Sequence, residues 1–197
     1  MISSKARLAE SAANILAGVP EIFSLVGTAY GAHLALKIAL IAPERMLSLW
    51  LMGCDPATLQ TGKPDIAAGF ETSTKTFIDM LSGLVVRPAD TEAAGAFRAT
   101  AQRVGAKASA AQARAVGSRS DLTIRLSELS MFALLTWGDE DAIVPASVGR
   151  QIADAMPSAT WHLIDHCDYL PKLERPAKAA MLYQAFFQDK SMLCAVA

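Results

Sequence analysis

The apolar positions in the first quarter of the chain switch between helical spacing and short continuous runs. Residues 8–16 place apolar side chains on one face of a helix, which Gly18 and Pro20 end. The runs 21–26 (EIFSLV) and 46–53 (MLSLWLMG) are almost wholly apolar, as is typical of strands buried on both faces. Between them, residues 30–42 predict a helix with a stripe of alanines that can approach a sheet closely.

The remaining sequence divides into two parts of different character. Residues 56–128 are rich in Ala, Thr, Ser and Arg, are broken by glycines, and predict several short helices. Strands and helices then alternate again, with strands at 131–137 and 159–164 and helices at 146–156 and 177–187. Alternation of this kind predicts an α/β fold, in which helices cover both faces of a parallel sheet of about four strands.

Length and charge limit the function classes. The 197 residues are 52% hydrophobic and carry a formal net charge of -1, which predicts one globular domain and no nucleic-acid partner. We expect no membrane span, because the longest apolar stretch is too short, and the absence of a signal sequence favours the cytoplasm. The basic residues between the second and third strands are interpreted as a solvated helix face: Arg87, Arg98, Arg103, Lys107, Arg114 and Arg119.

Cysteine usage points to a reducing compartment. Cys54, Cys167 and Cys194 are odd in number and widely separated, so they form neither a disulfide framework nor a zinc-binding pattern. We therefore expect no metal and no cofactor.

The segment LVGTAYGAHLAL, residues 25–36, contains the candidate chemistry. An apolar strand enters Gly27-Thr28-Ala29-Tyr30-Gly31, and a small-residue helix follows. This is the layout of a nucleophile elbow, G-x-S-x-G, in which a sharp turn projects a serine hydroxyl. The residue at the apex is Ala29, which has no group that can attack a carbonyl.

With three further segments in the same order, the chain resembles the C-terminal part of an α/β-hydrolase. LLTWGDEDAIVP is similar to the family's strand-end motif G-x-x-D-x-x-x-P and places the catalytic acid at Asp141. CDYLPKLERP is similar to the loop C-G-H-x-P-x-x-E-x-P. Residues 56–128 stand where the family inserts a helical cap, so the resemblance implies one domain with its core at 1–55 and 129–197. These segments are most similar to those of the esterase, enol-lactonase and C–C-bond hydrolase branch of the family.

The departures from the family pattern concern its chemistry. Ala29 occupies the serine position, Tyr169 the histidine position and Asp168 the neighbouring glycine position. A phenol with a pKa near 10 is a poor base at neutral pH, so a base-activated hydroxyl is missing. The resemblance also implies four strands before the elbow strand, and an early loop that supplies an oxyanion-hole donor. Only one helix precedes residues 21–26 here.

Several other residues near the elbow are candidates for ligand contact. Thr28 and Tyr30 flank the apex and carry hydroxyls, and Asp55 follows the second strand as an alternative acid or as a turn and helix-cap residue. His166 lies three residues before Tyr169 and could transfer protons if the loop register shifted. His33 and His162 are interpreted as helix-packing and sheet-face residues.

Three functional hypotheses follow. The first is a non-catalytic α/β-hydrolase homologue that keeps an apolar pocket for a small apolar ligand, or an interaction role. The second is an active enzyme that acts on an ester, lactone or diketone through Asp141 with Tyr169 or His166. The third is a degraded fragment without a selected function.

The predicted sheet has an unprotected edge. Without upstream strands, residues 21–26 would form an edge strand with no proline or lysine to block pairing. We expect either a homodimer through this strand or a missing half supplied from elsewhere, including from DNA upstream of Met1.

Overall fold

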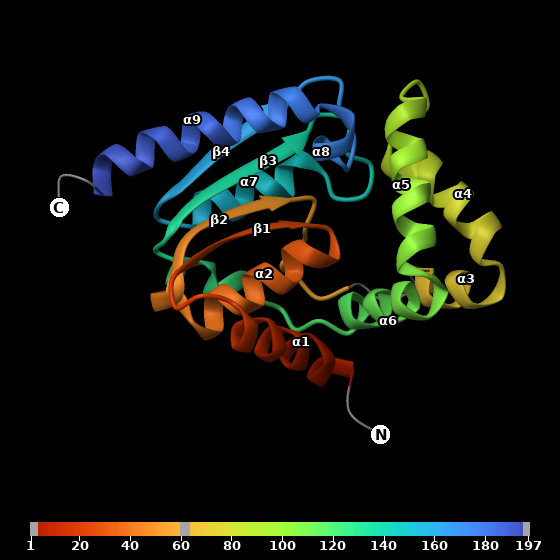
Figure 1. Ribbon diagram of the computed structural model, residues 1–197, viewed down its shortest axis with the longest axis horizontal. Helices are drawn as coiled ribbons and strands as arrows, with labels where there is room; N and C mark the ends of the chain where they lie inside the picture. The colour runs from red at the N-terminus through yellow and green to blue at the C-terminus, as the bar shows by residue number, and fades with distance from the viewer. Residues whose placement is uncertain (1–3, 60–63, 195–197) are drawn as a thin grey trace.

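Four parallel strands form one sheet in the order β1-β2-β3-β4 in the computed structural model of the protein (Figure 1). The structure describes residues 4–59 and 64–194. The strands are β1 (Phe23–Thr28), β2 (Met46–Met52), β3 (Phe132–Gly138) and β4 (Ala159–Ile164). The predicted parallel sheet of four strands is confirmed, and β1 and β4 are its edges among the described residues.

The first strand lies two residues further along the chain than residues 21–26. Glu21 and Ile22 are exposed outside the sheet, and the regular pairing with β2 runs on to Thr28, opposite Met52. The strand continues through the polar Gly27-Thr28 pair because the ladder, rather than the local apolar run, decides where a strand ends.

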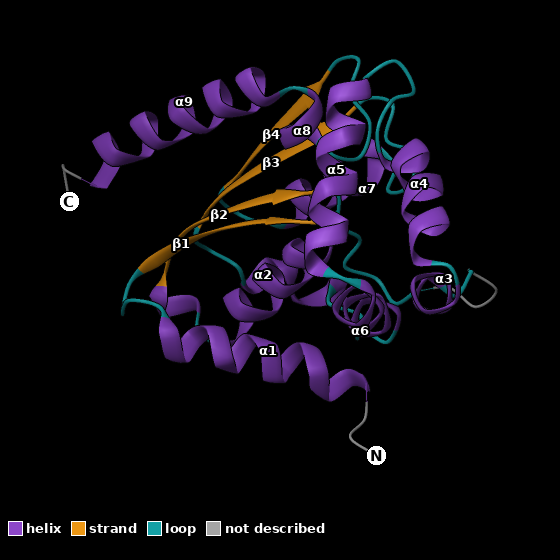
Figure 2. Cartoon of the chain, turned by 45° about the vertical axis from the view of Figure 1, so that its right-hand side comes forward, coloured by secondary structure: helices purple, strands orange, loops and turns teal. Residues whose placement is uncertain are grey.

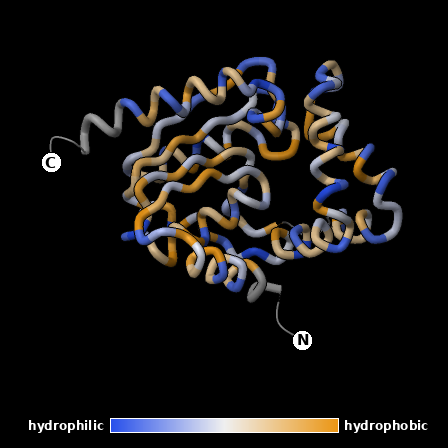
Figure 3. The backbone as a smooth tube through the Cα atoms, viewed as in Figure 1, coloured by the Kyte–Doolittle hydropathy of each residue, from blue (hydrophilic) through white to orange (hydrophobic). Residues whose placement is uncertain are grey.

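Two layers of helices cover the sheet (Figure 2). Helices α1 (Ser4–Gly18), α2 (Tyr30–Ile41) and α7 (Ala146–Ala155) pack on one face and form the main core with Leu49, Leu51 and Leu135. Helix α9 (Pro176–Cys194) packs on the opposite face, where Tyr183 stacks on Trp50 with ring centroids 4.8 Å apart. Hydrophobic positions are concentrated along the strands between these layers (Figure 3).

The remaining helices lie mostly beyond the carboxyl ends of the strands (Figure 1). Four of them, between β2 and β3, build a small core of their own in which Phe70 meets Phe77 edge to face. We call residues 66–117 the helical insertion. Its helices are α3 (Ile66–Thr72), α4 (Thr74–Val85), α5 (Thr91–Val104) and α6 (Ala106–Gly117). The short helices are η1 (Pro43–Arg45), η2 (Thr123–Glu128) and α8 (Pro171–Glu174).

Two glycines within helices provide a matched test of this packing. Gly149 of α7 is buried, and a methyl group there would lie 2.6 Å from Trp137 and Trp161. Gly95 of α5 has nothing within 4 Å of the same added atom.

We expect Gly149→Ala to lower the free energy of unfolding by about 1–3 kcal/mol through overpacking. Gly95→Ala should raise it by about 0.4–1 kcal/mol, because alanine restricts the unfolded chain. Urea unfolding measures both changes, and equal shifts for the two variants would contradict the packing of α7 on the tryptophans.

Candidate functional site

The elbow between β1 and α2 contains Ala29, one of two non-glycine residues with a positive φ in the described backbone. Ala29 has φ 51° and ψ -121°, a conformation that costs a non-glycine residue about 1–3 kcal/mol. Its N–H donates to Met52 O at 3.2 Å, and its carbonyl accepts from the N–H groups of Ala32 and His33. The turn therefore has the geometry of a nucleophile elbow, with a methyl group in place of a nucleophile.

Close contact between the strand and the helix imposes this turn. A side chain on Gly27 would put its Cβ 2.5 Å from Gly31 O and 2.6 Å from the Cα of Ala32. Only glycine at position 27 permits α2 to begin so close to the end of β1. The chain must therefore reverse within one residue, and Ala29 is that residue.

Asp141 follows β3 and is only half satisfied. Its Oδ1 accepts from Ile143 N at 2.9 Å and from Val144 N at 2.8 Å. Its Oδ2 is buried without a hydrogen-bond partner among the described residues. Burial raises the pKa of Asp141 to about 6, the two backbone hydrogen bonds oppose that rise, and the nearby Asp168 and Glu174 carboxylates add to it.

Tyr169 fills space between the core and the helical insertion. A Cβ on Gly53 would lie 2.6 Å from the Tyr169 ring, which leaves no space for a side chain. Gly53 also has a φ of 56°, a conformation that favours glycine. The ring packs with the main core and also with the cluster of Val85, Val86 and Leu170. Burial, then the Asp141 charge, raises the pKa of the Tyr169 phenol above its ordinary value. The phenol is therefore neutral at pH 7 and cannot serve as a base.

Glu174 organises the loop that contains Tyr169. Its Oε1 accepts from Asp168 N at 3.1 Å and Leu170 N at 3.4 Å, and its Oε2 accepts from Arg87 N at 3.1 Å. It is 4% exposed, and burial raises its pKa. One carboxylate thus holds the backbone of both the loop and the end of the α4 segment.

Asp168, at the family's glycine position, also has a structural contact. Its Oδ1 accepts from Ala142 N at 3.2 Å, which joins the loop after β4 to the loop after β3. The loop passes so close to the end of β3 that any side chain on Gly138 would collide with the carbonyls of Cys167 and Asp168. Local sequence patterns do not predict this contact, because it joins residues 26 positions apart.

His166 points away from Asp141. Its side chain is 76% exposed, and Nδ1 lies 3.5 Å from Glu140 Oε1. Its carbonyl accepts from Arg87 Nη1 at 3.2 Å, and its φ of 54° places it in a tight left-handed turn. The structure therefore pairs His166 with Glu140 and not with Asp141.

The three remaining candidates differ in the partners of their polar groups. Tyr30 directs its hydroxyl at Ser11 Oγ of α1, at 3.4 Å. Asp55 caps its own turn by accepting from Ala57 N at 2.9 Å. Thr28 is half-buried, and its Oγ1 is enclosed without a hydrogen-bond partner in the part of the chain that the structure describes.

Arg119 was assigned to a solvated helix face, and that prediction is wrong. Its residue is 8% exposed, and it donates to Asp55 O at 3.0 Å and Val116 O at 3.1 Å. Its Nη2 lies 3.6 Å from Asp55 Oδ2. The side chain fastens the end of α6 to the turn after β2, so the carbonyls and carboxylate compensate for its burial. The position of Arg119 in the sequence, between a helix and a strand, does not predict these acceptors, because Asp55 lies 64 positions earlier in the chain.

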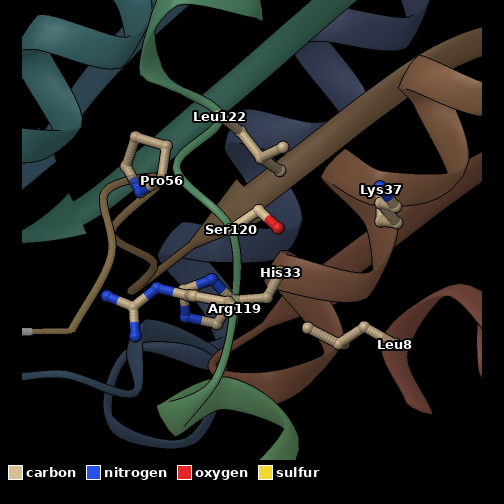
Figure 4. A pocket seen from close by; sticks show the side chains of 7 residues that line it. All are labelled: Leu8, His33, Lys37, Pro56, Arg119, Ser120 and Leu122. Carbon is tan, nitrogen blue, oxygen red and sulfur yellow. The ribbon is translucent and has the colours of Figure 1, made fainter. Parts of the chain in front are cut away.

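Arg119 also borders a hollow beside α2 (Figure 4). The cavity holds about 30 Å³, enough for one or two water molecules. Burial, and then the Arg119 charge, lower the pKa of His33 in its wall to about 3, so this imidazole is neutral. The lining residues are Leu8, His33, Lys37, Pro56, Arg119, Ser120 and Leu122. Ala29, Asp141 and Tyr169 are not among the residues that line this hollow.

The described residues offer neither a metal-binding cluster nor a membrane-spanning helix. Within residues 4–59 and 64–194, no group of three or more His, Cys, Asp or Glu side chains has an arrangement suited to a metal ion. Over the same residues, every helix is too short or too polar to cross a bilayer.

Known proteins share this architecture. A thermophilic esterase from Thermogutta terrifontis superposes with a TM-score of 0.83 at 19% identity, covering 96% of this chain and 73% of its own. The enol-lactonase from Burkholderia xenovorans gives a TM-score of 0.80 at 14% identity, covering 92% of this chain and 73% of its own. The chain has an α/β-hydrolase fold. It contains part of that fold, since the solved chains are longer.

Sequence comparison points to the same group. A pimeloyl-[acyl-carrier protein] methyl ester esterase from Nitrosomonas europaea is 27% identical over 183 residues, which are 85% of this chain and 72% of the esterase. A 2-hydroxy-6-oxononadienedioate/2-hydroxy-6-oxononatrienedioate hydrolase from Cupriavidus pinatubonensis is 27% identical over 81% of this chain and 59% of its own. No protein-family model matches the chain. The α/β-hydrolase fold is thus shared with esterases and C–C-bond hydrolases.

The raised pKa of Asp141 predicts a pH dependence of stability. Between about pH 4 and 6 the folded chain binds more protons than the unfolded chain, so stability falls as pH rises through that window. Asp141→Asn keeps an oxygen acceptor for the two N–H groups and removes the charge. The free energy of unfolding of Asp141→Asn minus that of the unmodified chain should rise by about 1–3 kcal/mol between pH 4 and pH 7. Only the unmodified chain has to ionise this buried carboxyl over that range.

Urea unfolding at a series of pH values measures this gain. Asp154→Asn is the control, since that carboxylate is exposed and paired with Arg150. Parallel pH curves for the unmodified chain and Asp141→Asn would contradict the assignment of a buried, half-satisfied carboxylate.

Proposed function

We propose that this chain is a non-catalytic α/β-hydrolase-like protein with a binding or interaction role. Ala29 is the observation that carries the proposal. The backbone retains the strained turn that projects a nucleophile, with φ 51° and ψ -121°, but the projected group is a methyl. Acyl transfer requires an attacking oxygen or sulfur at that point.

The position of the base supports the same conclusion. Tyr169 stands where the family places its histidine, and its phenol is buried against Gly53 with a raised pKa. In a serine protease, loss of the nucleophile or the histidine lowers kcat by roughly a million-fold. Here both are replaced, and the tyrosine ring instead joins the core to the helical insertion.

A solved neighbour supports a retained binding role. A serine-to-alanine mutant of the meta-cleavage product hydrolase from Pseudomonas fluorescens, complexed with acetates, superposes with a TM-score of 0.76 at 20% identity. In that protein an alanine variant still holds small carboxylates. We extend this to the space around Ala29, for a small ligand with an apolar part, because binding depends on shape and does not need a nucleophile.

The second candidate is an enzyme that uses Asp141 without a serine. The unpartnered Oδ2 and the pKa of about 6 favour it, because such a carboxylate can exchange protons near neutral pH. Against it, Tyr169 is neutral and His166 is paired with Glu140. An ester, lactone or diketone substrate would then have to be attacked by water alone.

Covalent labelling distinguishes the candidates. We expect the unmodified chain to show no adduct with a fluorophosphonate probe in mass spectrometry and no turnover of p-nitrophenyl acetate above buffer. The double variant Ala29→Ser, Tyr169→His should acquire the adduct, because the backbone already presents position 29 and Asp141 Oδ2 is free to orient an imidazole.

Each single variant is a matched control and should remain far less reactive than the double variant. Turnover by the unmodified chain that disappears in Asp141→Asn would overturn the proposal and support the enzyme. Saturable binding of acetate or a short p-nitrophenyl ester by the unmodified chain, measured by calorimetry, would support the ligand role over a purely structural one.

A further inference from the structure

The free edge of the sheet has a definite pattern of backbone groups. Ala29 N donates to Met52 O across the β1–β2 pair, so the backbone of Ala29 faces β2. Successive residues of a strand alternate in the direction of their N–H and C=O groups. The backbone groups of Ser24, Val26 and Thr28 therefore point out of the sheet, and no hydrogen bond to them is found among the described residues.

The side chains of those three residues lie on the same face of the sheet as Trp50, which pairs in register with Val26. Helix α9 covers this face over β2 and β3 but leaves Val26 52% exposed (Figure 2). The neighbouring Ile22 is 54% exposed. Residues 22–28 contain no charged side chain, so nothing along this edge opposes pairing with another strand.

The hydroxyl of Thr28 is a second, independent observation at this edge of the sheet. Its Oγ1 has no hydrogen-bond partner among the described residues, although a buried hydroxyl normally has one. Thr28 is half-buried, and its enclosed hydroxyl reaches a strand at the edge after a change to another staggered χ1 rotamer. Ser24, four residues earlier, accepts from Ser48 Oγ at 2.8 Å, which leaves the hydrogen of its own hydroxyl available for donation.

We propose that β1 pairs antiparallel with β1 of a second copy of this chain, about a two-fold axis at Val26. This register places Val26 opposite Val26 and Ser24 opposite Thr28 of the second copy, with opposed side chains on the same face. Each of the three opposed pairs exchanges two N–H···O bonds, so the register forms about six backbone hydrogen bonds.

The two-fold pairing accounts for the separate observations together. Each Thr28 hydroxyl meets the free donor of a Ser24, twice per dimer, and the two exposed valines cover each other. The strand has no charge to face its own copy, and like charges opposed in this way would be destabilising. The result is one continuous sheet of both copies with an α9 on the same face of each half.

Sedimentation equilibrium of the full chain at micromolar concentrations tests the proposal. We expect a dimer, and we expect Val26→Lys to raise its dissociation constant by about tenfold or more, because two ammonium groups would be opposed at the axis. Leu163→Lys is the matched control: it lies on β4, the other edge, and its exposure of 45% is similar. Leu163→Lys should leave the dimer unchanged.

Cross-linking tests the register without depending on the lysine variants. In a Cys194→Ser background only the buried Cys54 and Cys167 remain. Oxidation should link Val26→Cys chains to one another, since opposed Cα atoms lie about 5.5 Å apart, within disulfide reach. Ser24→Cys chains should link to Thr28→Cys chains but not to one another, because two Ser24 positions would lie roughly 13 Å apart along the strands.

Three results would overturn the proposal. A monomer at all micromolar concentrations excludes self-association. A dimer that survives Val26→Lys but is lost in Leu163→Lys places the interface on β4. Cross-linking of Ser24→Cys chains with themselves at the same rate as with Thr28→Cys chains rejects the register. None of these results bears on the chemistry at Ala29, so this inference and the proposed function fail independently.

Discussion

The contact between the end of β1 and the start of α2 constrains the rest of the structure. Gly27 lies so close to Gly31 and Ala32 that no side chain fits, and the chain must turn within a single residue. That residue, Ala29, takes a positive φ at a cost that the packed α2 has to offset. The packing of the apolar helix α2 against β1 thus holds the strained turn in place. The turn depends on this packing and not on a nucleophilic side chain at position 29.

The loops at the carboxyl ends of the strands are held together by buried carboxylates and one aromatic ring. Glu174 holds the backbone of the loop after β4, and Asp168 joins that loop to Ala142 after β3. Tyr169 then fills the space above Gly53 and packs with both the core and the helical insertion. Glu174, Asp168 and Tyr169 thus hold the strand-end loops and the helical insertion together. Asp141 is the exception, since its Oδ2 has no hydrogen-bond partner among the residues that the structure describes.

The proposed self-pairing concerns β1, which is an edge of the sheet among the described residues. The curated and solved relatives are longer than this chain, which spans 72% of the esterase from Nitrosomonas europaea and 73% of the esterase from Thermogutta terrifontis. A strand that ends a sheet needs a partner or a cover. A second copy would provide the partner at β1, in a register that also satisfies Thr28.

The sequence by itself determined the elements and their order. Apolar runs and helical spacing located all four strands, to within two residues at β1, and the G-T-A-Y-G segment predicted the elbow. It also identified Ala29, Asp141 and Tyr169 as positions of interest, because those motifs are local in the chain. Only the tertiary structure decided what each side chain touches. The burial of Arg119, the pairing of His166 with Glu140 and the direction of Tyr30 toward α1 join residues far apart in the sequence. Hydrophobic periodicity records whether a position faces the core, but the partner of a polar group depends on how distant loops meet, and no local pattern contains that information.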